Sequence, residues 1–353
     1  MTRPRIPKQA DVGLLAGVSR ATVSQVLNNK AGFLVPQETR QRVFAAAQEL
    51  GYVPNASARN LRSQKTLTIG VVIQDINNPF YPAFVRGVQD IAERAGYDVI
   101  SYNTDSSEIR ERHFLDVLRQ GRVDGVVGVF WHEGHPGLRD LTERGIPVAM
   151  LGQMKQGRDD LIDQVYVNAR QAACHAVQYL LGQGHRQITV VTGPGTILEE
   201  RVSGYLDAMS AAGPQAHIEV VRASNFTEDS GYDVGHLLFA AHSGAAQSRA
   251  AQSRAARSRP TAVFAVNDLL ALGLLRASRE WALRVPEDLA LVGFDDIPAA
   301  RLVTPALTTV RQFQERLGQR CTELLLERLD GRWADVASRR VEMPYEFVVR
   351  DST

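Results

Sequence analysis

Residues 17–29, GVSRATVSQVLNN, combine a helical apolar stripe with a small polar face. The stripe has i, i+3 and i+4 spacing and consists of Val23, Val26 and Leu27. The remaining faces carry Arg20, Ala21, Ser24 and Gln25. An exposed helix commonly presents Glu and Lys there, whereas short polar side chains and one Arg let a helix approach another surface closely. The side chains of this face could form hydrogen bonds with groups of that surface.

A second group of residues could bind a small polar ring. Asp75 follows the apolar run TLTIGVVI and precedes NNPFY, so a carboxylate and the rings of Phe80 and Tyr81 lie near a predicted strand end. Carboxylates and guanidinium groups can hold adjacent hydroxyls by paired hydrogen bonds, while aromatic faces cover the apolar side of a ring. Phe80 or Tyr81 could equally be an ordinary core residue.

Two short helices are predicted to position the first group. An apolar stripe of the first helix is expected from Val12, Leu15 and Ala16. Gly17 ends that helix, and Ser19 is placed to cap the second one, from about residue 20 to 28. Two helices joined by a tight turn that contains Gly form a helix-turn-helix.

A third helix is predicted to open at Pro36 and to end at Gly51. Its apolar side is expected to consist of Val43, Phe44, Ala47 and Leu50. Residues 54–65, PNASARNLRSQK, are polar and have no apolar stripe, which is typical of a linker. The sequence therefore predicts a small all-α head followed by a hinge.

From Thr66 onward, apolar runs alternate with amphipathic helical patterns. The runs are TLTIGVVI, YDVISYN, VDGVVGVF, IPVAML, QITVVTG, HIEVVRA, TAVFAVND and LALVGFDD. Such alternation predicts parallel sheets covered by helices on both faces. About 280 residues exceed one ordinary domain, so we expect an α/β body of two doubly wound lobes. Ligands of such folds bind beyond the carboxyl ends of the strands.

Charge is distributed unevenly along the 353 residues, a length that suggests two or three domains. Residues 1–65 hold ten Lys and Arg against three Asp and Glu, a net charge of +7, and the remainder carries −6. A basic head on an acidic body is expected of a nucleic-acid-binding module joined to another domain. The alternative is a head that is basic by chance or for solubility.

Several function classes lack support in the sequence. Cys174 and Cys321 form no disulfide framework, and the eight histidines show no metal-ligand spacing, so we expect no metal and no cofactor. GxSxG, P-loop and post-strand GxGxxG motifs are missing, so no enzyme is expected. Without a signal peptide or a run of 18 apolar residues, a cytoplasmic location is expected and no membrane partner. The AAQSR repeat at 245–259 suggests a solvent-exposed insertion, or else a second basic patch.

The chain resembles the LacI/GalR family of bacterial transcription regulators over nearly its whole length. The head GVSRATVSQVLNN and the segment VPQETRQRVFAAAQELGYVPNASARNLRS resemble that family's DNA-binding domain and hinge. In the body the family's order is kept by IGVVIQDINNPFY, VDGVVGV, GHRQI, RVSGY, FAVNDLLALG, LVGFDDIP and TPALTTV. The resemblance implies a helix-turn-helix domain (1–53), a hinge (54–65) and a two-lobed, periplasmic-binding-protein-like body (66–353) for effector binding and dimerisation.

The resemblance also implies that the second helix lies in the DNA major groove. Arg20, Ala21 and Gln25 match positions that read bases, where Arg suits guanine and Gln suits adenine. A plain phosphate contact is the alternative for Arg20. The positions expected to bind phosphates or cap the helix are Thr22, Ser24 and Asn29.

In the family, the hinge segment becomes a short helix on operator DNA. Leu61 then matches a leucine that wedges into the minor groove, a device that unstacks a base step. Arg59 and Arg62 flank it and suit phosphate or minor-groove contacts. The alternative is that Leu61 packs against the body.

The resemblance assigns effector contact to Asp75, Phe80, Tyr81, Arg201, Phe226, Asn267 and Asp295. Phe226 could instead be a core residue. Gly152 and Gln153 stand where relatives often have an acid or a stacking aromatic, so the effector's identity is open. We expect a regulator, most simply a repressor, that binds operator DNA as a homodimer and responds to a sugar or sugar derivative. The alternatives are a purine or nucleoside effector and a solute-binding protein without DNA function.

Overall fold

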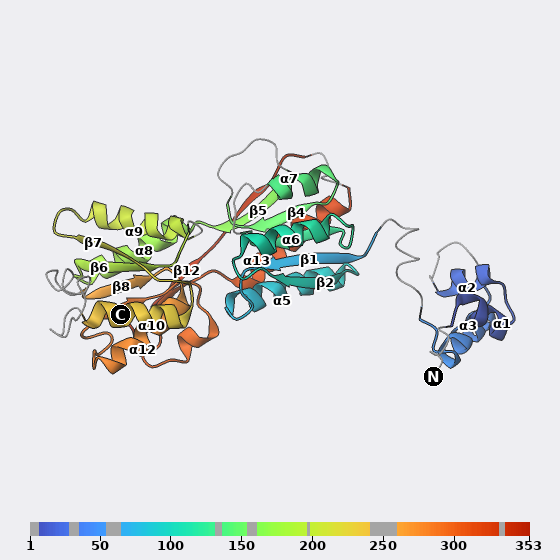
Figure 1. Ribbon diagram of the computed structural model, residues 1–353, viewed down its shortest axis with the longest axis horizontal. Helices are drawn as coiled ribbons and strands as arrows, with labels where there is room; N and C mark the ends of the chain where they lie inside the picture. Colours follow the sequence, from blue (N-terminus) through green and yellow to red (C-terminus); the bar gives the residue numbers. More distant parts are fainter. Residues whose placement is uncertain are drawn as a thin grey trace. The chain divides into compact units, whose positions relative to one another are not determined.

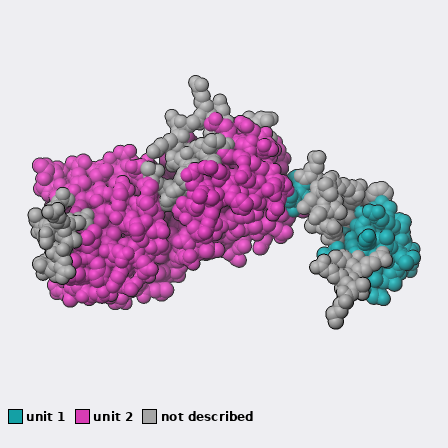
Figure 2. Space-filling model, in the orientation of Figure 1, with its two compact units in different colours: residues 1–66 teal, residues 67–353 magenta. Residues whose placement is uncertain are grey.

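The computed structural model describes residues 7–27, 35–53, 65–130, 136–153, 161–195, 198–240, 260–331 and 336–353. They form two compact units, Met1–Thr66 and Leu67–Thr353, which Figure 2 shows in different colours. The AAQSR repeat and most of the predicted hinge lie outside the described residues.

The described residues of unit 1 form three helices, α1 (Gln9–Ala16), α2 (Arg20–Leu27) and α3 (Gln37–Glu49). Their buried side chains meet in one cluster centred on Val12, Val23 and Val43. The turn between α1 and α2 passes through Gly17 at φ 64°, a conformation that glycine adopts without strain. The predicted cap of α2 is confirmed, because the Ser19 Oγ accepts a hydrogen bond from the Thr22 amide at 3.1 Å.

Two predicted core residues of unit 1 are exposed. Leu15 is 47% exposed and Phe44 is 54% exposed. In α1 the inward position belongs to Gly13, where a Cβ would lie 2.9 Å from the Val18 carbonyl oxygen. In α3 it belongs to Ala46. The helices approach each other closely, so the small Gly13 faces the core in place of Leu15, and Ala46 faces it in place of Phe44.

The first lobe of unit 2 is built on a six-stranded parallel sheet in the order β11-β5-β4-β3-β1-β2. The strands are β1 (Thr68–Ile73), β2 (Asp98–Asn103), β3 (Gly125–Gly128), β4 (Val148–Leu151), β5 (Ile162–Val167) and β11 (Arg340–Met343). The helices are α5 (Phe80–Arg94), α6 (Glu108–Leu118), α7 (Pro136–Glu143) and α13 (Gln314–Leu329). Neighbouring residues of one strand enter opposite cores, since Val71 packs in the α5 and α13 layer and Val72 packs in the α6 and α7 layer.

The second lobe is built on a four-stranded parallel sheet in the order β7-β6-β8-β9. The strands are β6 (Gln187–Thr192), β7 (His217–Arg222), β8 (Ala262–Ala265) and β9 (Ala290–Val292). The helices are α8 (Ala169–Gly182), α9 (Glu199–Ala211), α10 (Glu228–Ala240) and α12 (Asp268–Glu280). Figure 1 shows α8 and α9 on one face of the sheet and α10 and α12 on the other. The predicted pair of doubly wound lobes is confirmed.

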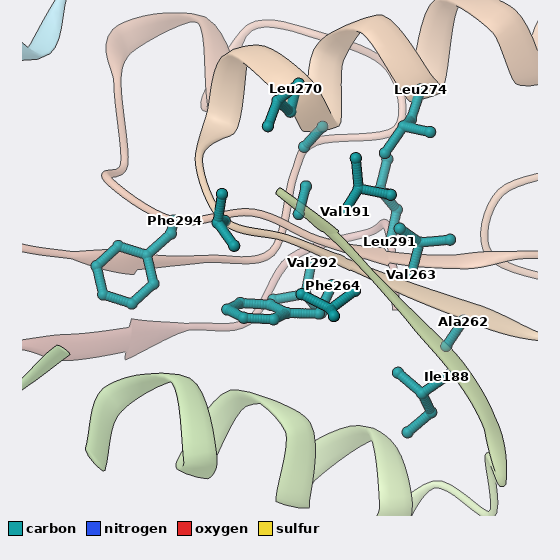
Figure 3. Close-up of a cluster of buried hydrophobic side chains, with 14 of the residues drawn as sticks. Ile188, Val191, Ala262, Val263, Phe264, Leu270, Leu274, Leu291, Val292 and Phe294 are labelled. Atoms are coloured by element: carbon teal, nitrogen blue, oxygen red, sulfur yellow. The ribbon is translucent and has the colours of Figure 1, made fainter. Parts of the chain in front are cut away.

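The core of the second lobe runs along the length of its sheet. Figure 3 shows Phe264, Val263 and Leu291 within this cluster, with Ile188 at one end and Phe294 at the other. Phe294 directly precedes Asp295, so the well-packed core ends where the polar strand-end residues begin.

Within the described residues, the chain passes three times between the lobes. The crossings follow β5 into α8, follow β10 (Thr309–Arg311) into α13, and follow β11 into β12 (Glu346–Val348). β12 pairs with β10 in an antiparallel ladder, and Ser352 bonds to Leu291 of the second lobe. Three connections therefore join the two lobes.

One buried ion-pair network holds the far edge of the first sheet together. Asp163 of β5 is fully buried and binds Arg328 through two hydrogen bonds of 2.7 Å. It also binds Arg339, at 2.6 Å to Nη2 and 2.9 Å to the backbone amide. Burial raises the pKa of Asp163, but the bonds from Arg328 and Arg339 outweigh it and hold this pKa below 3.8. The carboxylate thus joins β5, α13 and the chain entering β11.

We expect Asp163→Asn to destabilise the protein by about 3–5 kcal/mol, because it takes the counter-charge from the buried Arg328 guanidinium and leaves the half-buried Arg339 with Glu327. Since the folded-state pKa is depressed, the stabilisation is present above 3.8 and is lost as the pH falls below it. The gap in calorimetric melting temperature between wild type and variant should therefore shrink in acid. Asp116→Asn, which removes an exposed pair with Arg119, is the control and should cost less than about 1 kcal/mol. Equal small losses in both variants would contradict this role.

Candidate functional site

The outer side of α2 presents the predicted base-reading residues. Arg20 and Ala21 are exposed, and Gln25 is half-buried. The Thr22 hydroxyl lies 2.9 Å from the Ser19 Oγ, so it takes part in the helix cap, one of its two predicted roles. Ser24 is half-buried on the same helix. Asn29, Arg59, Leu61 and Arg62 lie outside the described residues.

Unit 2 contains a cavity of ≈ 380 Å³ between its lobes, at the carboxyl ends of the strands of both sheets. All seven predicted effector residues line it, from five separate segments of the chain: Asp75, Phe80, Tyr81, Arg201, Phe226, Asn267 and Asp295. A cavity of this volume suits a small molecule, since ligand pockets typically span about 300–1,000 Å³.

A buried ion pair forms the second lobe's side of the cavity. Arg201 Nη1 donates to Asp295 Oδ1 at 3.2 Å and to the Val266 carbonyl oxygen at 2.5 Å. The guanidinium carbon lies 3.8 Å above the centre of the Phe294 ring, a cation–π contact. Gln312 Nε2 donates to the same Asp295 oxygen at 2.7 Å. Two donors, Arg201 and Gln312, thus fix the carboxylate at the cavity, and Val266 and Phe294 hold Arg201.

Asp295 has a strained backbone and a shifted acidity. Its φ of 122° lies in the region that glycine favours, a cost of order 1–3 kcal/mol that surrounding contacts must outweigh. Burial raises the pKa of Asp295 above 3.8, although Arg201 and Gln312 lower it. Burial, followed by the Asp295 carboxylate, raises the pKa of the neighbouring Asp268. Strain and perturbed acidity at one cavity are typical of functional sites.

The two acids near Asp295, Asp268 and Asp296, stabilise the fold through hydrogen bonds and ion pairs. Asp268 accepts hydrogen bonds from the Thr309 hydroxyl at 2.6 Å and the Ile297 amide at 2.8 Å. Asp296 binds Arg311 at 2.6 Å and Arg350 at 2.5 Å. Both carboxylates tie strand ends to the β10 region.

Asn267 lines the cavity and is also held by hydrogen bonds within the second lobe. Its Oδ1 caps α12 by accepting from the Leu270 amide at 2.9 Å, and its Nδ2 donates to the Phe226 carbonyl oxygen at 2.9 Å. Phe226 also packs closely on Gly193, where a Cβ would lie 2.6 Å from the ring. The Asn267 amide thus positions Phe226, and its contact with an effector stays a prediction.

The first lobe contributes an aromatic wall. Phe80 and Tyr81 meet edge to face, with ring centres 5.3 Å apart and planes at 78°. Each residue is 8% exposed. Both rings belong to the hydrophobic core of the first lobe and also line the cavity, so each is a core residue and a cavity residue at once. The Tyr81 hydroxyl donates to Gln74 Oε1. Burial, then Asp295, raises the pKa of Tyr81, which keeps the phenol neutral.

Asp75 and several residues that sequence reasoning missed complete the lining. Asp75 is half-buried and its Oδ1 accepts from the Asn77 amide at 2.9 Å, an Asx turn. The missed polar residues include Gln74, Asp105, Tyr166, Arg170, Glu200, Asn225, Thr227 and Gln312. Gln74 and Glu200 could have been predicted, because each directly precedes a predicted site residue, Asp75 and Arg201. Gln312 belongs to a crossing between lobes and has no local sequence signal.

The described residues contain no cluster of His, Cys, Asp and Glu that could hold a metal ion. None of the helices that the structure describes combines the length and apolar character of a membrane span. The cavity instead offers hydrogen-bonding groups and aromatic faces, an environment suited to a polar ring.

Comparison with known proteins identifies both units. The profile for bacterial regulatory proteins of the lacI family matches residues 10–55, and that for the periplasmic binding protein-like domain matches residues 177–353. Catabolite control protein A of Priestia megaterium is 32% identical over 97% of this chain and 98% of its own. The repressor PurR of Photobacterium profundum is 33% identical over 97% of each chain. The ribose operon repressor of Escherichia coli is 35% identical over 90% of this chain and 92% of its own.

Solved structures give the same result. The complex of the transcriptional regulator CelR with cellobiose is 31% identical, covers 98% of this chain and all of its own, and has a TM-score of 0.68. The Lac repressor dimer bound to operator and the anti-inducer ONPF is 25% identical, covers 99% of each chain, and has a TM-score of 0.82. A matching head, a matching body and relatives aligned over nearly the whole length show that this chain belongs to the LacI family of bacterial transcription regulators.

Proposed function

We propose that this regulator is a repressor whose affinity for operator DNA is set by a sugar or sugar derivative in the cavity of unit 2. The observation that carries the proposal is the convergence of seven predicted residues from five segments on one cavity at the strand ends. The division into a DNA-binding domain (1–53), a hinge (54–65) and an effector-binding body (66–353) is part of the same proposal. We also propose a cytoplasmic location, because the proposed partner is chromosomal DNA.

On the DNA side, the exposed α2 residues support readout in the major groove. Arg20 would hold a guanine and Gln25 an adenine, while Ala21 would contact a thymine methyl group. Arg59, Leu61 and Arg62 would contact the minor groove and phosphates from the hinge. We further propose a homodimer on a near-palindromic site, which the solved Lac repressor dimer on its operator supports.

On the effector side, the geometry favours a sugar over a purine. Arg201, Asp295 and Asp75 can bind hydroxyl groups from both lobes. Phe80 and Tyr81 meet edge to face, so together they do not offer two parallel faces to a flat base. Ribose and cellobiose are bound by solved relatives. A solute-binding protein without DNA function is disfavoured by the lacI-family match of the head.

The decisive experiment selects bound duplexes from a random pool with the purified full-length protein, then measures operator affinity with D-ribose, cellobiose and hypoxanthine. The proposal expects a specific site, and an affinity for it that changes with a sugar. A response to hypoxanthine alone would establish the purine alternative, and an absence of any selected site would refute DNA recognition.

Arg20→Ala tests base readout. If Arg20 grips a guanine, the variant should lose about 1–3 kcal/mol on the best site and discriminate less at one base pair per half-site. Arg42→Ala, an exposed Arg on α3, is the matched control and should leave base preference unchanged. Binding to the selected site and to single-base variants, measured by fluorescence anisotropy, checks this. A uniform loss across all duplexes would show that Arg20 contacts phosphate only.

Leu61→Ala tests the minor-groove wedge. The variant should bind the selected site more weakly and bend it less, because the base step is no longer unstacked, while non-specific affinity is kept. Gel mobility of circularly permuted sites measures the bend. A bend equal to the wild-type value rules out the wedge.

Asp295→Asn tests the effector site. The variant keeps the shape of the side chain but removes the charge that holds Arg201, so stabilisation by the active sugar should disappear. In the wild type a hundredfold excess of ligand over Kd should stabilise unit 2 by about 2.7 kcal/mol. Asp233→Asn, an exposed acid on α10, is the control. Thermal shifts with D-ribose and cellobiose decide, and an undiminished sugar shift in Asp295→Asn would disprove the assignment.

A further inference from the structure

The cations that line the cavity are already paired within the protein. Arg201 is buried against Asp295 at 3.2 Å. Arg170 binds Asp207 in a bidentate pair, with distances of 2.6 and 2.9 Å. An anionic ligand would therefore have to share an arginine with an adjacent carboxylate.

Among the described residues that line the cavity, the carboxylates outnumber the arginines. Asp105 is paired with Arg110. Asp75 of the first lobe and Glu200 of the second lobe take part in none of the ion pairs found among the described residues. Glu200 lies near the Arg170 pair, since the pKa of Arg170 is raised first by Asp207 and further by Glu200. One surplus negative charge therefore lies on each side of the cavity.

We infer that the effector carries no phosphate or carboxylate group, being a neutral or amine-bearing polyhydroxyl compound, and that Glu200 together with Asp75 sets this selectivity. The inference rests on the proposed function, because it concerns the ligand of the same cavity. Hydroxyl and amine groups can donate to surplus carboxylates, whereas a phosphate ester cannot and is repelled by them. Asp75 is half-buried, so solvent screens its charge less than a surface charge, whereas Glu200 is an exposed residue of the cavity lining and its charge is screened more.

The experiment uses the full-length protein and a bacterial small-molecule extract, divided on an anion-exchange column. The flow-through holds neutral and cationic compounds, and the retained fraction holds phosphates and carboxylates. We expect thermal stabilisation of unit 2 by the flow-through. Stabilisation by the retained fraction alone would overturn the inference and leave the proposed function intact. If neither fraction stabilises the protein, the proposed function fails and the inference falls with it.

Charge-neutral variants test the residues. Two pairs of ligands are compared: D-ribose with D-ribose 5-phosphate, and the compound isolated from the flow-through with its phosphate ester. Wild type should bind the phosphorylated compound of each pair at least about tenfold more weakly than the unphosphorylated one. Asp75→Asn combined with Glu200→Gln should reduce that ratio by about tenfold. Glu199→Gln, the neighbouring exposed acid in the first turn of α9 that does not line the cavity, should leave the ratio unchanged. An equal ratio in wild type and the double variant, or tighter binding of the phosphate ester by wild type, would refute the role of these charges.

Discussion

The buried ion pair between Arg201 and Asp295 is the interaction on which the organisation of unit 2 depends. Removing two charges from water is costly, and their attraction compensates for it only when further bonds satisfy the pair. Here Val266, Gln312 and the Phe294 ring supply such contacts in part, since the buried Arg201 Nε has no hydrogen-bond partner among the described residues. A hydrophobic pair would fill the space at lower electrostatic cost, so the charges are better explained by recognition than by stability. The strained φ of Asp295 supports the same conclusion.

The ion pair also connects the cavity to a crossing between the lobes. Gln312 donates to the Asp295 carboxylate, and Gln314 donates to the Asp295 carbonyl oxygen. These residues flank Phe313, whose φ of 56° turns the chain from β10 into α13. α13 then packs on α5 of the first lobe, whose first turn carries Phe80 and Tyr81. A ligand that shifts Asp295 therefore acts on both walls of its own cavity, a direct physical basis for coupling occupancy to lobe separation.

The sequence patterns predicted most of the fold because most strands are continuous apolar runs. All eight predicted runs are strands, but the strands β5, β10, β11 and β12 were not predicted. In β5 the buried Asp163 and Gln164 interrupt the apolar pattern. Asp163 is buried only because Arg328 and Arg339 reach it from 165 and 176 residues away, and no local rule contains that information. The exposure of Leu15 and Phe44 has a related cause, because helix spacing allowed two stripes and only the packing distance selects the smaller residues. Cavity residues such as Asp75 and Asp295 could be predicted because they follow apolar runs. Gln312 could not, because it reaches the cavity only through the path of the chain between the lobes.

The distribution of charge connects these features. A net charge of +7 in residues 1–65 attracts the phosphate backbone, while −6 in the rest of the chain repels it, so non-specific attraction to DNA is concentrated in the head. Inside unit 2 the same excess of acids leaves Asp75 and Glu200 at a cavity whose arginines are already bound. The one chain thus separates its charges by sign: basic residues predominate in the head, and carboxylates outnumber arginines among the described residues of the cavity in unit 2.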